Sequence, residues 1–151
     1  MFHIFHQTLK RRIAEEKALR DIGDLSSPML LLTLFEMEIS GKQCSQRELA
    51  RKMGLSPATI AVSLKPLERD GYVERCTDER DARRNLVSLT DKGRDAVKRC
   101  EEALRAVDRQ MMLGFTAEEC DTFSVFLERM IENLGGAELC PCHLSLEKEE
   151  T

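Results

Sequence analysis

Residues 45 to 71 read SQRELARKMGLSPATIAVSLKPLERDG and contain the signals for two short helices joined by a tight turn. Ser45 and Glu48 have the spacing of a capping box, in which both side chains satisfy backbone groups at a helix start. Gly54 supplies the left-handed conformation that ends a helix. Ser56 and Pro57 then provide a second N-cap and a first-turn proline. The sequence therefore predicts one helix between Ser45 and Gly54 and another from Ser56 to about Gly71.

The second of these helices has one apolar side and one small, polar side. Its apolar residues Ile60, Leu64 and Leu67 share a face. The residues that then point outward are Ala58, Thr59, Val62, Ser63 and Lys65.

A charged hairpin is expected after Gly71. The periodicity changes to two extended segments, 72–76 and 86–89, which flank a polar stretch, 77–85, with six charged residues. Two helices followed by such a hairpin are typical of a winged helix-turn-helix, and we name the hairpin the wing. An α-helix, about 10 to 12 Å across with its side chains, fits the major groove of B-DNA, while a basic hairpin tip can reach the backbone or the minor groove. The class of fold is therefore mostly α (α+β).

Helices are also predicted on both sides of this unit. Apolar spacing indicates one from Phe2 to about Arg20 and another from Pro28 toward Gly41, with Ser27 as the N-cap of the second. A long helix begins at Thr90 and tolerates Gly93 in its first turn, and a capping box at Thr116 starts the last one. We expect a single domain over 1–136, with the winged helix-turn-helix at 45–93 and a tail at 137–151.

Charge and composition narrow the class of protein. The 151 residues carry a net charge of −4, yet residues 45–95 hold 11 basic and 9 acidic residues, a net +2. Residues 45–95 are therefore the part of the chain that we expect to contact DNA. The runs without a charge, such as residues 25–35, are too short for a membrane span, and no secretory signal is evident, so we expect a cytoplasmic protein. Phosphate-loop, dinucleotide, zinc-protease and nucleophile-elbow motifs are missing, which argues against an enzyme.

Between residues 45 and 93 the sequence resembles the multiple-antibiotic-resistance regulator (MarR) family. The matching segments are SQRELA at 45–50, LSPATI at 55–60, LERDGYVER at 67–75, DERDAR at 78–83 and VSLTDKG at 87–93. The pattern D-x-R followed by V-x-L-T-x-x-G is the specific part. The resemblance extends over about 135 residues and leaves the tail unmatched.

This resemblance implies a homodimer built from helices at about 1–22 and 93–135, and a palindromic operator in double-stranded DNA. It assigns Arg83 to the minor groove and Asp81 to positioning that arginine. The candidate DNA-binding residues are accordingly those of the two helices and the wing: Gln46, Ser56, Ala58, Thr59, Val62, Ser63, Lys65, Arg80, Arg83 and Arg84. The chain departs from the family pattern at Ala82, where the family often has another arginine, and at Val62, where a polar or basic base-reading residue is common. At Val62 we expect specificity to come from apolar contact with a thymine methyl. Pro66 removes a backbone donor late in the helix.

The expected function is a DNA-binding regulator, usually a repressor, released by a small molecule or by thiol chemistry. No cofactor is expected, and the effector is not identified by the sequence. Two alternatives stay open: a winged helix used for protein contacts, and a metal- or redox-responsive regulator that uses Cys140, Cys142 and His143 in the tail. His3 and His6 share a helix face but favour an ordinary surface or dimer role, and Cys100 and Cys120 favour small core residues.

Overall fold

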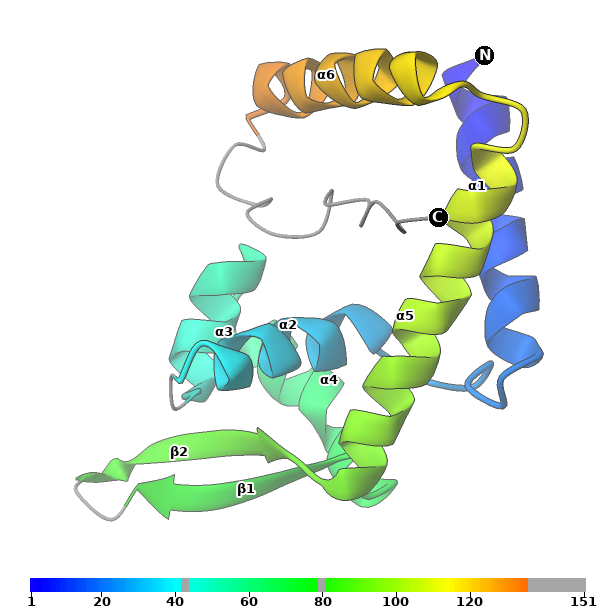
Figure 1. Ribbon diagram of the computed structural model, residues 1–151. Coiled ribbons are helices and arrows are strands. Elements are labelled where there is room, and N and C mark those ends of the chain that lie inside the picture. Colours follow the sequence, from blue (N-terminus) through cyan, green and yellow to red (C-terminus); the bar gives the residue numbers. More distant parts are fainter. Residues whose placement is uncertain (42–43, 79–80, 136–151) are drawn as a thin grey trace. The chain divides into compact units, whose positions relative to one another are not determined.

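The computed structural model describes residues 1–41, 44–78 and 81–135, and for residues 77–78 and 81–85 it describes the backbone alone. In chain order the elements are α1 (Phe2–Ala18), α2 (Pro28–Ile39), α3 (Gln46–Met53), α4 (Pro57–Arg69), β1 (Val73–Asp78), β2 (Asp81–Leu89), α5 (Asp91–Met111) and α6 (Ala117–Asn133), as Figure 1 shows. The prediction of a mostly helical winged helix-turn-helix is confirmed. Among the described residues, no helix is both long enough and apolar enough to cross a membrane.

The two helices of the motif begin and end where the sequence predicted. At the start of α3, the Ser45 hydroxyl accepts from the Glu48 backbone N–H at 3.3 Å, and the Glu48 carboxylate accepts from the Ser45 N–H at 2.9 Å. Gly54 ends this helix with a φ of 64°. Ser56 caps α4 by accepting from the Thr59 N–H at 3.1 Å. The helix then continues through Pro66 to Arg69.

The core lies between α2, α3, α4, the hairpin and α5. Its largest completely buried side chains come from all of these elements: Leu30, Leu31, Leu34, Leu49, Ile60, Leu64, Leu67, Leu89 and Val97. Burial of the inner face of α4 leaves its opposite face to solvent, which fixes the orientation of the helix.

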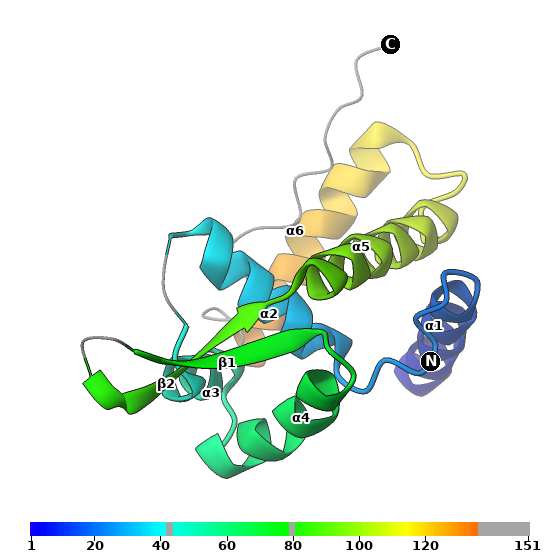
Figure 2. The same cartoon turned by 90° about the horizontal axis from the view of Figure 1, so that it is seen from below.

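The wing is a two-stranded antiparallel sheet that is longer than predicted. Val73 pairs with Leu89 and Thr77 pairs with Asn85, and the register shifts between Thr77 and Asp78. The hairpin is as predicted, but the expected extended segments, 72–76 and 86–89, are too short, because most of the polar stretch 77–85 also belongs to the strands. Alternating polar residues are compatible with a solvent-facing hairpin, so charge alone does not indicate a loop. Figure 2 shows the hairpin beside α3 and α4.

Two predicted helix starts need correction. Ser27 precedes α2 with Pro28 in the first turn, but its side chain makes no capping hydrogen bond. Gly93 is required rather than tolerated, since a Cβ atom there would lie 2.1 Å from the backbone oxygen of Tyr72. Thr90 holds this close approach, because its N–H donates to the same oxygen at 3.1 Å.

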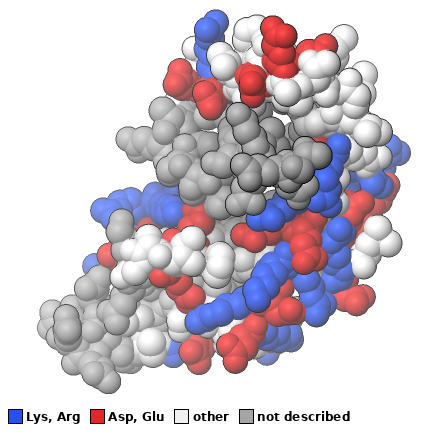
Figure 3. Space-filling model, viewed as in Figure 1, with Lys and Arg blue, Asp and Glu red and all other residues white. Residues whose placement is uncertain are grey.

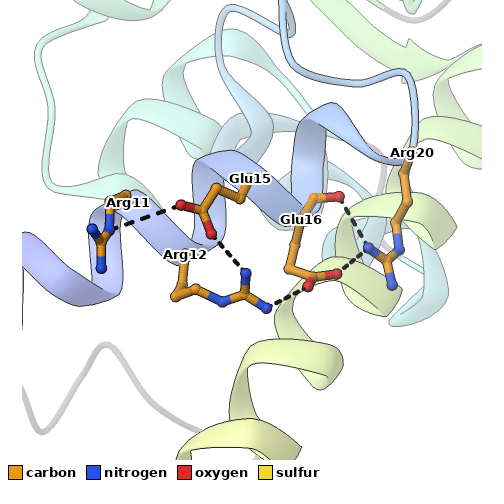
Figure 4. A network of polar contacts seen from close by, with 5 residues as sticks. All are labelled: Arg11, Arg12, Glu15, Glu16 and Arg20. Atoms are coloured by element: carbon orange, nitrogen blue, oxygen red, sulfur yellow. Dashed lines mark hydrogen bonds and ion pairs between the residues drawn. The ribbon is translucent and has the colours of Figure 1, made fainter.

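A chain of ion pairs lies along α1 (Figure 4). Glu16, which is buried, lies between Arg12 and Arg20, and its carboxylate accepts hydrogen bonds from both. Arg20 also lies 3.9 Å from Glu102 on α5, and its carbonyl accepts from Arg99 at 3.4 Å. These contacts attach the end of α1 to α5.

The chain divides into two compact units, residues 1–110 and 111–151. In the second unit a capping box at Thr116 and Glu119 starts α6, as predicted. No residue of α6 is buried, and its apolar side chains remain open to solvent, including Val125, Phe126 and Met130.

Candidate nucleic-acid interface

The exposed face of α4 carries the residues that the sequence assigned to base reading. Ala58, Thr59, Val62 and Lys65 are exposed, and Ser63 is half-buried. Val62 stands out, because 66% of its surface is open to solvent although the side chain is apolar. The structure thus brings these residues onto one surface, and their contact with DNA stays a prediction.

Several polar groups around this surface are engaged within the protein. The hydroxyls of Ser56 and Thr59 lie 2.8 Å apart. The Gln46 side-chain amide donates to the Pro57 carbonyl at 3.0 Å. Gln46 therefore ties the start of α3 to the start of α4, a role that its position in the sequence did not indicate.

Two contacts that the sequence did not reveal attach the wing to the helices. Arg75 on β1 forms an ion pair with Glu68 on α4, with 3.0 Å between Arg75 Nε and Glu68 Oε2. At the root of the hairpin, two register positions from Arg75, Glu38 on α2 accepts from the Leu89 N–H at 2.8 Å, and its second oxygen lies 3.3 Å from Arg94 Nη1. The partners of Glu38 are about 50 residues away in the chain, so no short motif could have identified them.

At the wing tip the structure describes only part of the backbone. Arg80 lies outside the described residues, and so do the side chains of Asp81, Arg83 and Arg84, whose backbone belongs to β2. Their assigned roles stay predictions.

Charges are mixed on the surface that can be seen. On the face in Figure 3, Lys and Arg side chains alternate with Asp and Glu instead of forming one basic patch. Arg69 near the end of α4 illustrates this, because its guanidinium donates to Asp70 at 2.8 and 3.1 Å. This pairing lowers the pKa of Asp70. On this face, therefore, no patch of a single charge marks a surface for DNA.

The cysteines in the described part of the chain differ in accessibility. Cys44 and Cys100 are buried, Cys120 is half-buried and Cys76 on β1 is exposed. The core placement is thus right for Cys100 and only partly right for Cys120. Burial raises the pKa of Cys44 to about 11, and its sulfur lies 3.4 Å from the Met37 sulfur. Cys140, Cys142 and His143 lie outside the described residues, and within those described no group of three side chains could hold a metal.

We expect thiol reagents to modify Cys76 well before Cys44. Only the thiolate reacts, and raising the pKa from 9.0 to about 11 lowers the thiolate fraction of Cys44 near pH 8 by roughly 100-fold, in addition to the steric effect of burial. Iodoacetamide labelling of a Cys140→Ser, Cys142→Ser variant, followed by peptide mass spectrometry, measures both rates. Denatured protein, in which both thiols react alike, is the control, and equal rates in the folded protein would contradict the buried environment of Cys44.

A winged helix-turn-helix whose second helix presents its outer face to solvent defines a class of transcriptional regulators, and comparison with known proteins identifies the family. The sequence model described as MarR family matches residues 27–84. The chain is 31% identical over 116 residues to the uncharacterized HTH-type transcriptional regulator YdgJ of Bacillus subtilis, a match that covers 77% of this chain and 69% of that protein. It is 34% identical over 91 residues to the HTH-type transcriptional repressor Rv2887 of Mycobacterium tuberculosis, covering 60% of this chain and 63% of the relative.

Solved structures show the same fold. The S. aureus MepR–DNA complex superposes with a TM-score of 0.69 at 20% identity and covers 88% of this chain and 93% of that chain. The chain belongs to the MarR family of transcriptional regulators. That family consists of regulators rather than enzymes.

Proposed function

We propose that the chain binds a palindromic operator as a homodimer in the cytoplasm, where it represses transcription until a small molecule or a thiol signal releases it. The observation that carries the proposal is the exposed outer face of α4, capped at Ser56 and held in place by a completely buried inner face. A helix N-terminus favours phosphate through its free N–H groups, and the first turns of a recognition helix reach base edges.

Dimer formation is supported by apolar surface that a single chain leaves uncovered. Exposed fractions are 78% for Phe2, 69% for Ile4 and 53% for Phe126. Exposed apolar side chains of this size, on α1 and on α6, are expected to pack against a partner. A second copy of the chain would cover the exposed apolar side chains of both copies, because a two-fold interface joins the same surface of each subunit.

Relatives support two further parts of the proposal, DNA binding and repression. Rv2887 is a repressor and MepR was solved with DNA, which favours the same activities here. A two-fold dimer presents two copies of α4, which must meet the same face of the duplex about one helical turn apart. A signal that changes their separation would weaken contacts at both half-sites.

Selection of bound sequences from a random DNA pool tests the proposal. We expect an inverted repeat with half-sites about one helical turn apart, and an affinity that falls steeply as salt rises. A protein that enriches no sequence and whose weak binding is independent of salt would overturn the proposal and favour a protein-interaction module.

Replacing Arg83 with alanine should weaken operator binding by about 1 to 3 kcal/mol, because an arginine in the minor groove loses its contact. Fluorescence anisotropy with the selected operator measures the change. Lys98→Ala is the matched control, since it also removes one positive charge, but from an exposed position on α5. Similar losses in the two variants would mean that Arg83 contributes only general charge.

A further inference from the structure

Few side chains on the outer face of α4 could read a base by a pair of hydrogen bonds. Between Ser56 and Pro66 the polar residues are Ser56, Thr59, Ser63 and Lys65 alone. Arginine usually donates two hydrogen bonds to guanine, and asparagine or glutamine usually makes a pair of hydrogen bonds with adenine. Lysine can also hold guanine in this way, so within this stretch Lys65 is the residue that could read a base by a pair of hydrogen bonds, and the N-terminal turns of the helix depend on other contacts.

Two hydroxyl groups on this face, those of Ser56 and Thr59, already make hydrogen bonds within the protein. Thr59 and Ser56 share a hydrogen bond of 2.8 Å, and Ser56 also caps the helix. The nearby amide of Gln46 donates to Pro57, and the guanidinium at the end of the helix, Arg69, is held by Asp70. These internal bonds restrict the positions that the side chains can take against DNA, although each keeps some hydrogen-bonding capacity.

An apolar surface lies between these occupied groups. Val62 is 66% exposed, and Leu55 just before the helix is 44% exposed. Ala58 precedes Val62 by one turn, so both present methyl groups on the same side. Lys65 lies a turn beyond Val62, further from the N-terminal turns that reach base edges.

Resting on the proposed function, we propose that Val62 recognises thymine, by packing its methyl groups against the C5-methyl of one thymine in each operator half-site. The thymine methyl is the apolar feature that distinguishes a T·A pair in the major groove. Contact removes two apolar surfaces from water together, which supplies discrimination without a hydrogen bond. Specificity at this position then depends on a methyl group and not on donors and acceptors.

Replacing thymine with deoxyuridine tests this directly, because it deletes the methyl and leaves the pairing edge unchanged. Each thymine of the selected operator is replaced in turn, in one half-site and then in both. At one position we expect affinity to fall roughly fourfold for one half-site and roughly fifteenfold for both, the effect of one or two buried methyl groups. The other positions should change little.

Protein variants then assign the effect to Val62. Val62→Ala should bind the thymine operator more weakly and no longer distinguish thymine from deoxyuridine at that position. Lys65→Ala is the control, which should weaken both operators equally and keep their ratio. Because both side chains are exposed, neither change disturbs the core, and circular dichroism checks the fold.

The outcomes separate the two proposals. An operator that binds tightly with no sensitivity to any thymine methyl overturns the role of Val62 and leaves the regulator intact. A sensitivity that persists in Val62→Ala overturns it as well. If the pool yields no bound DNA at all, the proposed function fails together with this inference.

Discussion

Replacing Phe126 with glutamate should convert the dimer into single chains and remove tight operator binding. Phe126 lies on the apolar side of α6, where no residue is buried within its own chain. A symmetric interface would bury the new charge twice, without a partner. We expect the dimer dissociation constant to rise by at least about 100-fold, measured by analytical ultracentrifugation, and operator affinity to fall with it.

Glu128→Lys is the control for this prediction. Residues 126 and 128 lie on nearly opposite sides of the helix, since each residue turns the chain by about 100°. Glu128 is exposed, and the control changes the net charge by more than Phe126→Glu does. It should leave the mass in solution unchanged. A Phe126→Glu protein that remains dimeric would place the interface elsewhere.

Gly93→Ala should lower the free energy of unfolding by about 3 kcal/mol, which is large for the addition of one methyl group. The new Cβ would lie 2.1 Å from the Tyr72 backbone oxygen, which is far inside contact distance. That oxygen also accepts from the Thr90 N–H, so the backbone cannot move away without losing a hydrogen bond. Urea unfolding followed by circular dichroism, at one fixed protein concentration, measures the loss.

Gly23→Ala is the matched control, because a Cβ there would meet Ala18 at an ordinary 3.6 Å. Its stability should change by less than about 0.5 kcal/mol. Equal stabilities for the two variants would mean that α5 approaches the hairpin less closely than described.

Local signals predicted much of the fold. Capping boxes at Ser45 and Thr116, and the left-handed glycine at position 54, act within a few residues, so the sequence displays them directly. The inner face of α4 was equally readable, because burial follows the helical period. These signals also predicted which residues of α4 face solvent.

Contacts between distant segments could not be predicted in this way. The closeness of Gly93 to Tyr72 depends on how α5 meets the hairpin, and Gln46 reaches Pro57 only because two helix starts lie side by side. The wing strands were underestimated, because pairing across the hairpin overrides the local preference of charged residues for loops. Long-range geometry therefore decides the details of the candidate site, while its location follows from local pattern.

Glu38 has a mechanical consequence for the wing. One carboxylate on α2 holds the last residue of β2 through a backbone N–H and faces Arg94 in the first turn of α5. Arg94 in turn donates to the Leu89 carbonyl at 2.8 Å. The root of the wing is thus held where α2, β2 and α5 meet. A rotation of α5 would therefore turn the hairpin with it.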